Sequence, residues 1–459
     1  MSDTFQSLGL RPELLEALAQ ISYTSMTPIQ AQSLPPMLHG QDVTGQAKTG
    51  SGKTAAFGLA ILNTVDPQLM ATQCLVLCPT RELAEQVATE LRRLAQRQAN
   101  TRILTVCGGR PYRDQMLSLR RGAHIVVGTP GRVGKHLRKA TLALDSLRVL
   151  VCDEADRMLD MGFIDQVEEI VEGCPENRQT LLFSATFPDQ ITALSGRIQR
   201  DALRVTVETQ VATDVLRQQV FRTTPGARNQ LVADLLCQFQ PSTALVFCET
   251  RDDCKSLGAF LSGRGAVAMT LHGEMEQRDR DDVLVQFTNG SVSVLVATNL
   301  AARGLDIPEL PLVIIAELSH DPESHLHRIG RTGRAGEEGL AVSIVAGKRE
   351  QQRLENIEEH LGYEIERAPA PPRGGNLNFL KPSCRTLLIL SGKRDKIRKG
   401  DVLGSLIKDG GIPADAIGRI DLMPKACAVA IDKEWAHQAQ RHLRTGRVKN
   451  RRVRVQLLG

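Results

Sequence analysis

The sequence predicts an α/β protein with two doubly wound parallel-sheet lobes followed by a small α+β domain. Two series of short apolar strands alternate with helical stretches, one up to about residue 205 and one from about residue 215 to 366. A run rich in Pro and Gly then precedes a basic segment with a β-α-β-β-α-β pattern. We therefore expect lobe 1 at 1–205, lobe 2 at 215–366, a linker at 367–383 and a C-terminal domain at 384–459.

The composition fits a protein of several packed domains in a reducing compartment. The 459 residues are 42% hydrophobic, yet no run of about 18 apolar residues predicts a membrane span. The start, Met1–Thr4, lacks the basic and then apolar pattern of a signal peptide. Ten cysteines are scattered without a CxxC pair, so we expect neither a zinc site nor a disulfide framework, and a cytoplasmic location fits.

The net charge of +5 is unevenly distributed along the chain. Residues 384–459 contain 17 Lys and Arg against 7 Asp and Glu, a net charge of +10. The rest of the chain contains 40 and 45 and is therefore mildly acidic, at −5. A basic module on an acidic body is typical of a segment that binds nucleic acid or another anionic surface.

Short apolar runs that end in polar clusters mark the expected strands of both lobes. In lobe 1 the expected strands are Cys74–Leu77, Ile103–Val106, Ile125–Val127, Val149–Cys152 and Leu181–Phe183. In lobe 2 they are Thr243–Cys248, Ala268–His272 and Val292–Thr298. We also expect an amphipathic helix at Phe5–Gln20 and a hinge between the lobes at Val205–Phe221.

Lobe 1 is organised around the segment Arg148–Asp156, which reads RVLVCDEAD. Its apolar part predicts a buried parallel strand, and ligands of open α/β sheets bind at the carboxyl ends of such strands. There Asp153 can hold a magnesium ion, and Glu154 can orient or deprotonate a water for in-line attack on a phosphate. Taken alone, these carboxylates fit equally well an acidic helix start favoured by the helix dipole.

A second motif, at residues 47–54, favours nucleotide binding. It follows the pattern of a phosphate loop, except that Ala47 stands where the strict pattern has Gly. Its glycines let backbone N–H groups close on phosphate oxygens, while Lys53 reaches the terminal phosphates and Thr54 offers a hydroxyl to magnesium. We assign to ATP the loop residues Ala47, Lys48, Thr49, Gly50, Ser51, Gly52, Lys53 and Thr54, and to the metal Thr54 and Asp153.

Three further polar clusters follow strands and are expected at the same sheet edge. They are Pro79–Leu83, Gly108–Arg110 and Thr129–Arg132. Hydroxyls, backbone N–H groups and arginines at such an edge suit a sugar-phosphate backbone. Each cluster alone also fits a capped helix start.

Lobe 2 has no second phosphate loop, which suggests that it completes the nucleotide site of lobe 1. The segment His327–Arg334 carries three arginines that would be costly to hold together without anionic partners. We predict that Arg331 and Arg334 are arginine fingers, which stabilise charge on the γ-phosphate across a cleft. A plain basic patch is the alternative.

Asp153–Asp156, the phosphate loop and Ser184–Thr186 together resemble the motifs of the DEAD-box ATP-dependent RNA helicases. The resemblance implies that both lobes are recA-like, and that Tyr23 and Gln30 read the adenine in a Q motif. It also places Asp306 at the ATP, in a segment where Asn299 replaces the Asp that is common in the family.

The same resemblance implies roles for residues in both lobes, with ATP and Mg²⁺ as cofactors. The implied catalytic residues are Lys53, Asp153, Glu154, Arg331 and Arg334. The implied RNA contacts are Arg81, Gly109, Thr129, Pro130, Gly131, Arg132, Arg251, Arg280 and Thr298. The residues implied to couple hydrolysis to strand separation are Ser184, Thr186, Asp156 and His327.

The C-terminal domain is predicted to be RRM-like, because its element order is that of RNA-recognition modules. The expected strands are Thr386–Leu390, Ile417–Leu422, Ala426–Ile431 and Arg452–Leu457, and the expected helices are Asp401–Lys408 and Lys433–Leu443. The central strand 426–431 lacks the aromatic residues on which such modules stack bases. We therefore expect binding through charge, at Lys393, Arg394, Lys396, Arg398, Lys399, Arg447, Lys449, Arg451 and Arg452, with a merely solvated basic face as the alternative.

This domain also resembles the C-terminal domain of the DbpA group of DEAD-box helicases, in residues 391–394, 399–404 and 452–458. The resemblance implies that the chain recognises a hairpin of the large-subunit ribosomal RNA and acts on a pre-ribosomal particle during assembly of that subunit. We expect a monomer. A DNA translocase and a non-enzymatic RNA clamp stay open as other classes. The response of the ATPase to RNA or DNA tests the first, and a phosphate-release assay tests the second.

Overall fold

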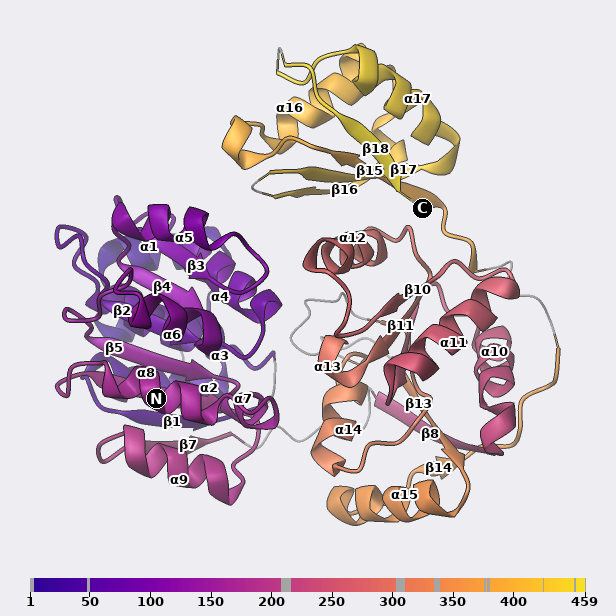
Figure 1. The fold of residues 1–459 in the computed structure, drawn as a ribbon, viewed down its shortest axis with the longest axis horizontal. Coiled ribbons are helices and arrows are strands. Elements are labelled where there is room, and N and C mark those ends of the chain that lie inside the picture. The colour runs from indigo at the N-terminus through magenta and orange to yellow at the C-terminus, as the bar shows by residue number, and fades with distance from the viewer. Residues whose placement is uncertain are drawn as a thin grey trace. The chain divides into compact units, whose positions relative to one another are not determined.

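A computed structural model describes residues 4–47, 50–207, 216–302, 310–333, 339–374, 377, 380–423, 425–449 and 451–458. The described chain falls into two compact units, one that ends near residue 210 and one that begins there. The first unit is lobe 1, and the second contains lobe 2 and the C-terminal domain (Figure 1). Among the described residues, no helix is long and apolar enough to cross a membrane.

Lobe 1 is a parallel sheet of seven strands in the order β3-β4-β2-β5-β6-β1-β7. The strands are β1 (Val43–Gln46), β2 (Cys74–Leu77), β3 (Ile103–Val106), β4 (Ile125–Gly128), β5 (Val149–Asp153), β6 (Gln179–Ser184) and β7 (Leu203–Thr206). The α-helices are α1 (Pro12–Gln20), α2 (Pro28–Leu38), α3 (Lys53–Thr64), α4 (Arg81–Leu94), α5 (Tyr112–Arg120), α6 (Pro130–Arg138), α7 (Ala155–Asp160), α8 (Ile164–Glu172) and α9 (Asp189–Ile198).

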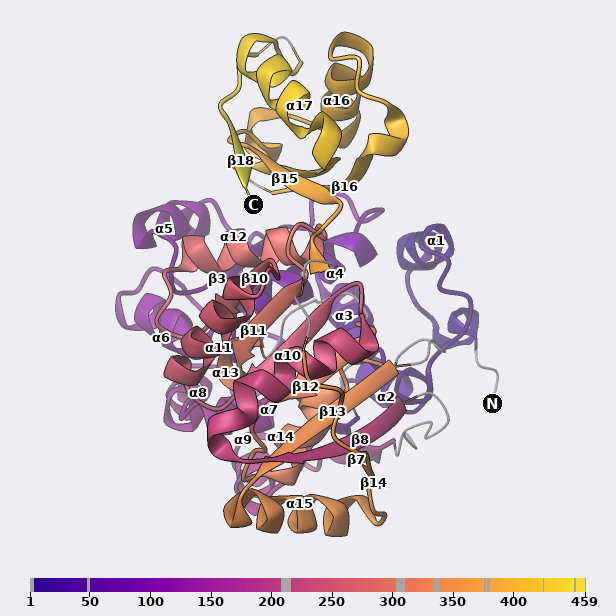
Figure 2. The same cartoon turned by 90° about the vertical axis from the view of Figure 1, so that its right-hand side faces the viewer.

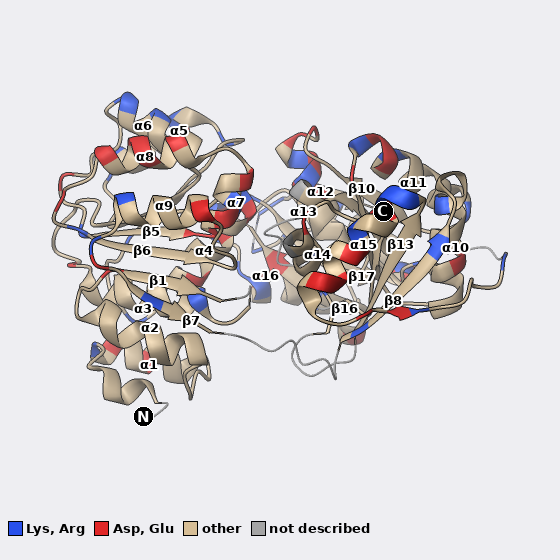
Figure 3. Ribbon diagram, turned by 90° about the horizontal axis from the view of Figure 1, so that it is seen from below, with Lys and Arg blue, Asp and Glu red and all other residues tan. Residues whose placement is uncertain are grey.

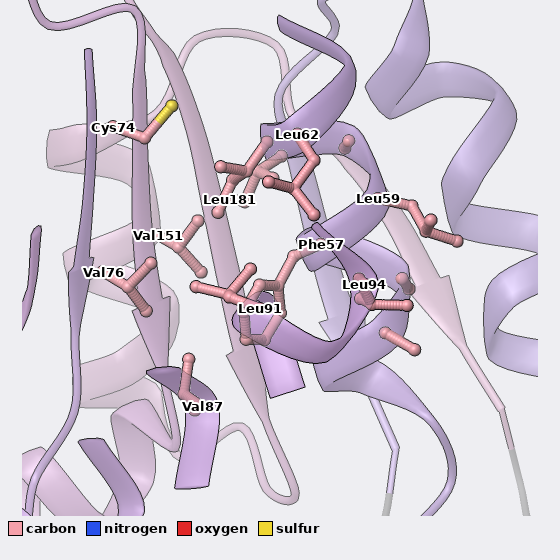
Figure 4. Packing of buried hydrophobic residues seen from close by; sticks show 14 of the residues in the cluster. Phe57, Leu59, Leu62, Cys74, Val76, Val87, Leu91, Leu94, Val151 and Leu181 are labelled. Carbon is pink, nitrogen blue, oxygen red and sulfur yellow. The ribbon is translucent and has the colours of Figure 1, made fainter. Parts of the chain in front are cut away.

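The hydrophobic core of lobe 1 holds α3, the helix that follows the phosphate loop. This helix is apolar on nearly all sides and is buried from Ala55 to Leu62, so it is the central helix on one face of the sheet. Figure 4 shows Phe57 and Leu62 of α3 packed among Leu91 of α4 and Val151 of β5. Burying each large side chain stabilises the folded lobe by about 1.5–3 kcal/mol. This packing holds α3 in place, and with it the phosphate loop at its start.

Lobe 2 repeats the plan with a parallel sheet in the order β10-β11-β9-β12-β13-β8-β14. The strands are β8 (Leu216–Thr223), β9 (Ala244–Cys248), β10 (Ala268–Leu271), β11 (Val294–Thr298), β12 (Leu312–Ile315), β13 (Gly339–Ala346) and β14 (Glu366–Arg367). The α-helices are α10 (Arg228–Phe239), α11 (Arg251–Gly263), α12 (Gln277–Thr288), α13 (Asn299–Ala302), α14 (Pro322–Ile329) and α15 (Lys348–Leu361).

The C-terminal domain is an antiparallel sheet in the order β16-β17-β15-β18, with both helices on one face (Figures 1 and 2). Its elements are β15 (Cys384–Ile389), α16 (Lys399–Gly404), β16 (Ile417–Leu422), β17 (Cys427–Asp432), α17 (Lys433–Thr445) and β18 (Val455–Leu458). Leu387, Val429 and Ile431 face the helices and form the core. The two lobes and this domain confirm the predicted fold class.

Several element predictions need correction. The helix expected at Phe5–Gln20 is broken into a 3-10 turn, Phe5–Leu8, and α1, because Gly9 adopts a left-handed φ of 65° and Pro12 starts a new helix. The expected hinge at Val205–Phe221 is shorter than predicted, since β7 and β8 take its two ends. The last strand begins at Val455 rather than near Arg452.

The segment expected to be a linker is in fact anchored to lobe 2. Leu377 and Leu380 are 0% and 1% exposed and belong to the hydrophobic core of that lobe. The Leu377 N–H donates to the Arg264 carbonyl at 2.8 Å, and the Ala368 N–H donates to the Val220 carbonyl at 3.0 Å. The high Pro and Gly content predicted an unpacked linker. Burial of only two leucines is nevertheless enough to hold the segment on lobe 2.

Candidate active site and RNA-contact residues

The phosphate loop leaves β1 and ends at the start of α3. Gly50 and Gly52 have φ values of 88° and 96°, a region that favours glycine and that lets the backbone turn its N–H groups inward. Lys53 is buried, and its ammonium group donates to the Ala47 carbonyl. The Ser51 hydroxyl is buried without a hydrogen-bond partner among the described residues. Lys48 and Thr49 lie outside the described residues.

The acidic strand end lies where the sequence predicted it, on a neighbouring part of the same edge. Asp153 ends β5, is 2% exposed, and has one carboxylate oxygen, Oδ1, without a hydrogen-bond partner among the described residues. Burial raises the pKa of Asp153 above its usual range, the Glu154 carboxylate raises it further, and Lys53 and Arg157 lower it. A buried carboxylate oxygen without a partner among the described residues fits a divalent cation bound with a nucleotide.

Glu154 caps α7 in a strained backbone conformation. Its φ and ψ are 55° and 54°, in the left-handed region that residues other than glycine rarely adopt. Its carboxylate forms an ion pair of 2.7 Å with Arg157, and both side chains are almost fully buried. In Figure 3 the ribbon at α7 is coloured red where its acidic residues lie.

Ser184 and Thr186 contact the same acidic segment, because β6 lies beside β5. The Asp156 N–H donates to the Ser184 hydroxyl at 3.1 Å. The Thr186 N–H and hydroxyl both donate to Asp156 Oδ2, at 3.1 and 3.2 Å. Three of the residues predicted to couple hydrolysis to strand separation, Ser184, Thr186 and Asp156, are therefore in contact, while the coupling itself stays a prediction.

Gln30 and Tyr23 contact different parts of lobe 1. Gln30 is buried, its amide donates to the Gly52 carbonyl at 3.1 Å, and its oxygen accepts from the Thr27 N–H at 2.9 Å. Gln30 thus ties α2 to the phosphate loop. The half-buried Tyr23 donates its hydroxyl to Glu90 at 3.2 Å, and burial, followed by the Glu90 charge, raises its pKa. Adenine reading by both residues stays a prediction.

The three clusters predicted to contact RNA converge beyond the neighbouring strands β3, β4 and β2. The Arg81 guanidinium lies against Gly108 and Gly109, so closely that a Cβ on Gly109 would overlap it. Gly109 also has a φ of 70°, which is a second reason for glycine at this position. Arg132 donates to the Arg110 carbonyl at 3.0 Å. Thr129, Pro130 and Gly131 begin α6 at the same edge.

The strand order divides the edge of lobe 1 into two halves. Strands β5, β6 and β1 carry the acidic segment, Ser184–Thr186 and the phosphate loop. Strands β3, β4 and β2 carry the clusters predicted to contact RNA. The halves meet where β2 pairs with β5. Ligand sites at the carboxyl ends of an open α/β sheet follow from this topology.

In lobe 2, the arginines predicted from the motif have different surroundings. Arg328 is 1% exposed and donates to the Glu317 carbonyl at 2.7 Å and to Glu249 Oε2 at 3.0 Å. It therefore has the anionic partner that the sequence argument required. Arg331 follows α14 and is buried, and His327 is half-buried on that helix. Arg334 and Asp306 lie outside the described residues.

The remaining lobe 2 residues predicted to contact RNA lie at two adjacent strand ends. Thr298 ends β11 and pairs in register with Cys248, the last residue of β9, and Arg251 begins the helix that follows β9. Arg251 forms ion pairs with Asp252, at 3.3 Å, and with Glu274. Arg280 donates to the Ala301 carbonyl at 3.4 Å. Both arginines thus have protein partners in this structure.

The two basic segments of the C-terminal domain lie side by side. The Lys449 ammonium donates to the Lys396 carbonyl at 2.6 Å and pairs with Asp401 at 3.5 Å. Arg451 lies 3.7 Å from Asp395. The predicted residues of this surface are all exposed: Lys393, Arg394, Lys396, Arg398, Lys399, Arg447, Lys449, Arg451 and Arg452. We call them the basic surface.

Sequence reasoning missed Arg157. It was overlooked because a single arginine after an acidic run reads as a solvated helix residue, whereas the structure buries it to 2% exposure. Its spacing of three residues from Glu154 on a helix was the available clue, since such pairs face one another.

Comparison with known proteins bears on all three folded parts. Residues 27–194 match the DEAD/DEAH box helicase family, residues 227–336 match the helicase conserved C-terminal domain, and residues 386–457 match the DbpA RNA binding domain. The ATP-dependent RNA helicase DbpA of Escherichia coli (strain K12) is 49% identical over 449 residues, which are 98% of each chain. The DbpA of Bacillus subtilis (strain 168) is 36% identical over 473 residues, again 98% of each chain.

Solved structures agree with this assignment. Saccharomyces cerevisiae Dbp5 bound to RNA and ADP BeF3 is similar with a TM-score of 0.74 and 30% identity, over 80% of this chain and 96% of that one. Two recA-like lobes with a phosphate loop and an Asp-Glu-Ala-Asp strand end define a nucleotide-dependent RNA helicase. The chain belongs to the DEAD-box ATP-dependent RNA helicases of the DbpA type, and it carries their RNA-binding domain.

Proposed function

We propose that this helicase is directed by its C-terminal domain to a hairpin of the large-subunit ribosomal RNA and acts on a pre-ribosomal particle during assembly of that subunit. The single observation that carries the proposal is the basic surface, in which two segments about 50 residues apart in sequence meet on one domain. The similarity of that domain to the DbpA RNA binding domain supports it. We propose a monomer that works in a bacterial cytoplasm, with lobe 1 at 1–205, lobe 2 from residue 215 and the C-terminal domain at 384–459. The segment 367–383, predicted as a linker, is held on lobe 2 through Leu377 and Leu380.

For ATP we propose a division of labour within lobe 1. Lys53 leaves the Ala47 carbonyl to bind terminal phosphates, and the backbone N–H groups of the loop bind phosphate oxygens. Asp153 and Thr54 would hold Mg²⁺, which neutralises charge on the phosphates, and the orphaned Oδ1 of Asp153 fits that use. Glu154 orients the attacking water. Gln30, already bound to Gly52, places the adenine relative to the loop.

We propose that lobe 2 completes the site through Arg331 and Arg334, with Asp306 at the nucleotide. Arg328 serves a different purpose, because its contacts to Glu249 and to the Glu317 carbonyl hold α14 against the rest of lobe 2. A fixed α14 positions Arg331 without the loss of side-chain entropy that a free helix would cost. His327, on the same helix, belongs to the proposed coupling residues together with Ser184, Thr186 and Asp156.

We propose that lobes 1 and 2 bind RNA without distinguishing its sequence. Hydroxyls, backbone N–H groups and arginines at the strand ends contact phosphate and sugar, which position a strand but carry no sequence information. The residues are Arg81, Gly109, Thr129, Pro130, Gly131, Arg132, Arg251, Arg280 and Thr298. Selectivity then lies in the basic surface, which reads the shape and phosphate geometry of a folded hairpin.

The decisive experiment compares RNA selectivity with and without the C-terminal domain. Full-length protein and a form truncated after Ser383, which keeps Leu377 and Leu380, are assayed for RNA-stimulated ATPase with the hairpin and with a scrambled RNA of equal length at one salt concentration. We expect the truncated form to retain turnover at high RNA concentration and to lose the preference for the hairpin. A truncated form with undiminished preference would place selectivity in the lobes.

A charge-reversal pair sharpens this test. Lys393→Glu changes the basic surface, and Lys425→Glu changes another exposed lysine of the same domain that is not part of it. We expect the first to weaken hairpin binding and to reduce its salt dependence, since one fewer counterion is released. Equal effects of both changes would indicate a general charge effect rather than a binding surface.

A further inference from the structure

We infer that Arg157 is a positioning residue for the hydrolytic step, which holds the Glu154 carboxylate in place for the attacking water. The inference rests on the proposed role of Glu154. It starts from three facts: the Arg157 and Glu154 side chains are 3% and 6% exposed, they form an ion pair of 2.7 Å, and Glu154 has a left-handed backbone.

The burial of this pair calls for an explanation. Removing two charges from water costs several kcal/mol per ion, and well-packed apolar residues of similar volume are often equally stable. Stability alone therefore does not account for a buried arginine at this position. A role in fixing one conformation of the carboxylate does, because buried ion pairs can specify a single arrangement.

The backbone of Glu154 shows what must be fixed. A non-glycine residue in the left-handed region is strained and persists only where its surroundings hold it. Glu154 lies between the end of β5 and the first turn of α7, so its backbone is held on both sides. Its side chain is held through Oε2, the atom paired with Arg157, and Oε1 is the oxygen that we assign to the water.

Arg157 is itself held by the residues proposed to couple hydrolysis to RNA. The backbone N–H of Arg157 donates to Asp156 Oδ1 at 2.9 Å. Asp156 Oδ2 in turn accepts from the backbone N–H and the hydroxyl of Thr186. A displacement of Thr186 therefore reaches Glu154 through Asp156 and Arg157. This route lies entirely within lobe 1.

The test is a double-mutant cycle between Arg157→Met and Glu154→Gln. Methionine keeps the length and apolar stem of arginine without the charge. We expect Arg157→Met to lower kcat of the RNA-stimulated ATPase by about tenfold to a hundredfold, as for a misplaced general base, and to change KM for ATP and the affinity for ADP by less than about twofold. Fluorescent ADP binding supplies a readout that does not depend on turnover.

The cycle decides whether Arg157 acts through Glu154. In the Glu154→Gln background, single-turnover hydrolysis is expected to be unchanged by Arg157→Met, because no carboxylate is left to position. A further loss of the same size there would overturn the inference, and so would an Arg157→Met protein with parental kcat. If Glu154→Gln itself hydrolyses ATP like the parent, the proposed role of Glu154 fails first, so the two failures are distinguishable.

Two more variants separate positioning from folding. Arg157→Lys keeps a positive charge near Oε2 and is expected to recover part of the lost kcat. Arg138→Met is the matched control, since it removes an ion pair of 2.6 Å to Glu169 that is exposed on the surface of the same lobe, and it should behave like the parent. Weaker ADP binding and lower melting temperature in Arg157→Met and Arg157→Lys alike would show a purely structural role.

Discussion

Truncation on either side of residues 377–380 should give two proteins of very different stability. A cut after Pro372 removes Leu377 and Leu380 from the core of lobe 2, whereas a cut after Ser383 retains both. The shorter form also loses the hydrogen bond between the Leu377 N–H and the Arg264 carbonyl, and the contact of the Ser293 hydroxyl with the Leu380 carbonyl.

The magnitude follows from burial. Each leucine is at most 1% exposed, and burying such a side chain contributes about 1.5–3 kcal/mol, so the pair contributes roughly 3–6 kcal/mol. A domain has a free energy of unfolding of about 5–15 kcal/mol, so the loss is a large fraction of it. In the full-length protein, Leu380→Ala should cost about 2–5 kcal/mol, since it also leaves a cavity.

The assay is urea unfolding of lobe 2 in the 1–372 and 1–383 forms, followed by circular dichroism. We expect the 1–372 form to unfold at a clearly lower urea concentration. In the full-length protein, Leu380→Ala is compared with Leu403→Ala, whose side chain is 38% exposed and which should cost less than about 1 kcal/mol.

Equal unfolding of the two truncated forms would refute the reasoning. It would mean that residues 377–380 do not belong to the folded core of lobe 2, and that the segment is the free spacer predicted from its composition. Equal costs of Leu380→Ala and Leu403→Ala would lead to the same conclusion.

Three further predictions concern the two motor lobes. Lys53→Ala should weaken ATP binding at least about tenfold, since it removes the ammonium group of the phosphate loop, and fluorescent nucleotide titration measures this. Arg331→Ala should leave ATP affinity within about threefold and lower kcat by about a hundredfold or more, and a parental kcat would exclude it as an arginine finger. Burial lowers the pKa of His136 to about 4, so lobe 1 loses stability as the pH falls from about 6.5 toward 4, because the unfolded chain takes up the proton first. Between pH 7.5 and 5.5 this should cost about 1 kcal/mol in urea unfolding, and His136→Gln should lose that share of the slope.

Sequence patterns predicted several strands of lobe 1 but missed β12, a fully buried and wholly apolar strand of lobe 2. The runs at Cys74–Leu77 and Ile103–Val106 form β2 and β3 with the predicted bounds, because an apolar run ended by polar residues allows few alternatives. Strand β1 was missed because Val43–Gln46 is short and mixed in composition. It is buried only because the sheet places it between β6 and β7, and strand order is a tertiary property that local composition does not encode.

The candidate site was predictable as a set of residues and not as an arrangement. The sequence identified Glu154 and Asp156 as acidic residues at a strand end, but it could not show that Arg157 is buried beside Glu154. That contact arises from the left-handed turn at Glu154, which starts α7 and brings residue 157 back over residue 154. Conversely, Arg328 was predicted to need an anion, and Glu249, 79 residues away, supplies it.

The order of strands in lobe 1 offers a physical basis for the proposed coupling between ATP and RNA binding. The half that carries the phosphate loop and the half that carries Arg81 meet at the pairing of β2 with β5, with Leu77 opposite Cys152. Asp153 and the cluster around Arg81 therefore leave adjacent strands, a few ångströms apart in a sheet whose neighbouring strands are spaced by about 4.8 Å. A shift of β5 on nucleotide binding would be passed to β2, and so to the cluster proposed to contact RNA, without any intervening element. Both strands are fully buried and close-packed, so the sheet between them would not absorb the displacement by local deformation.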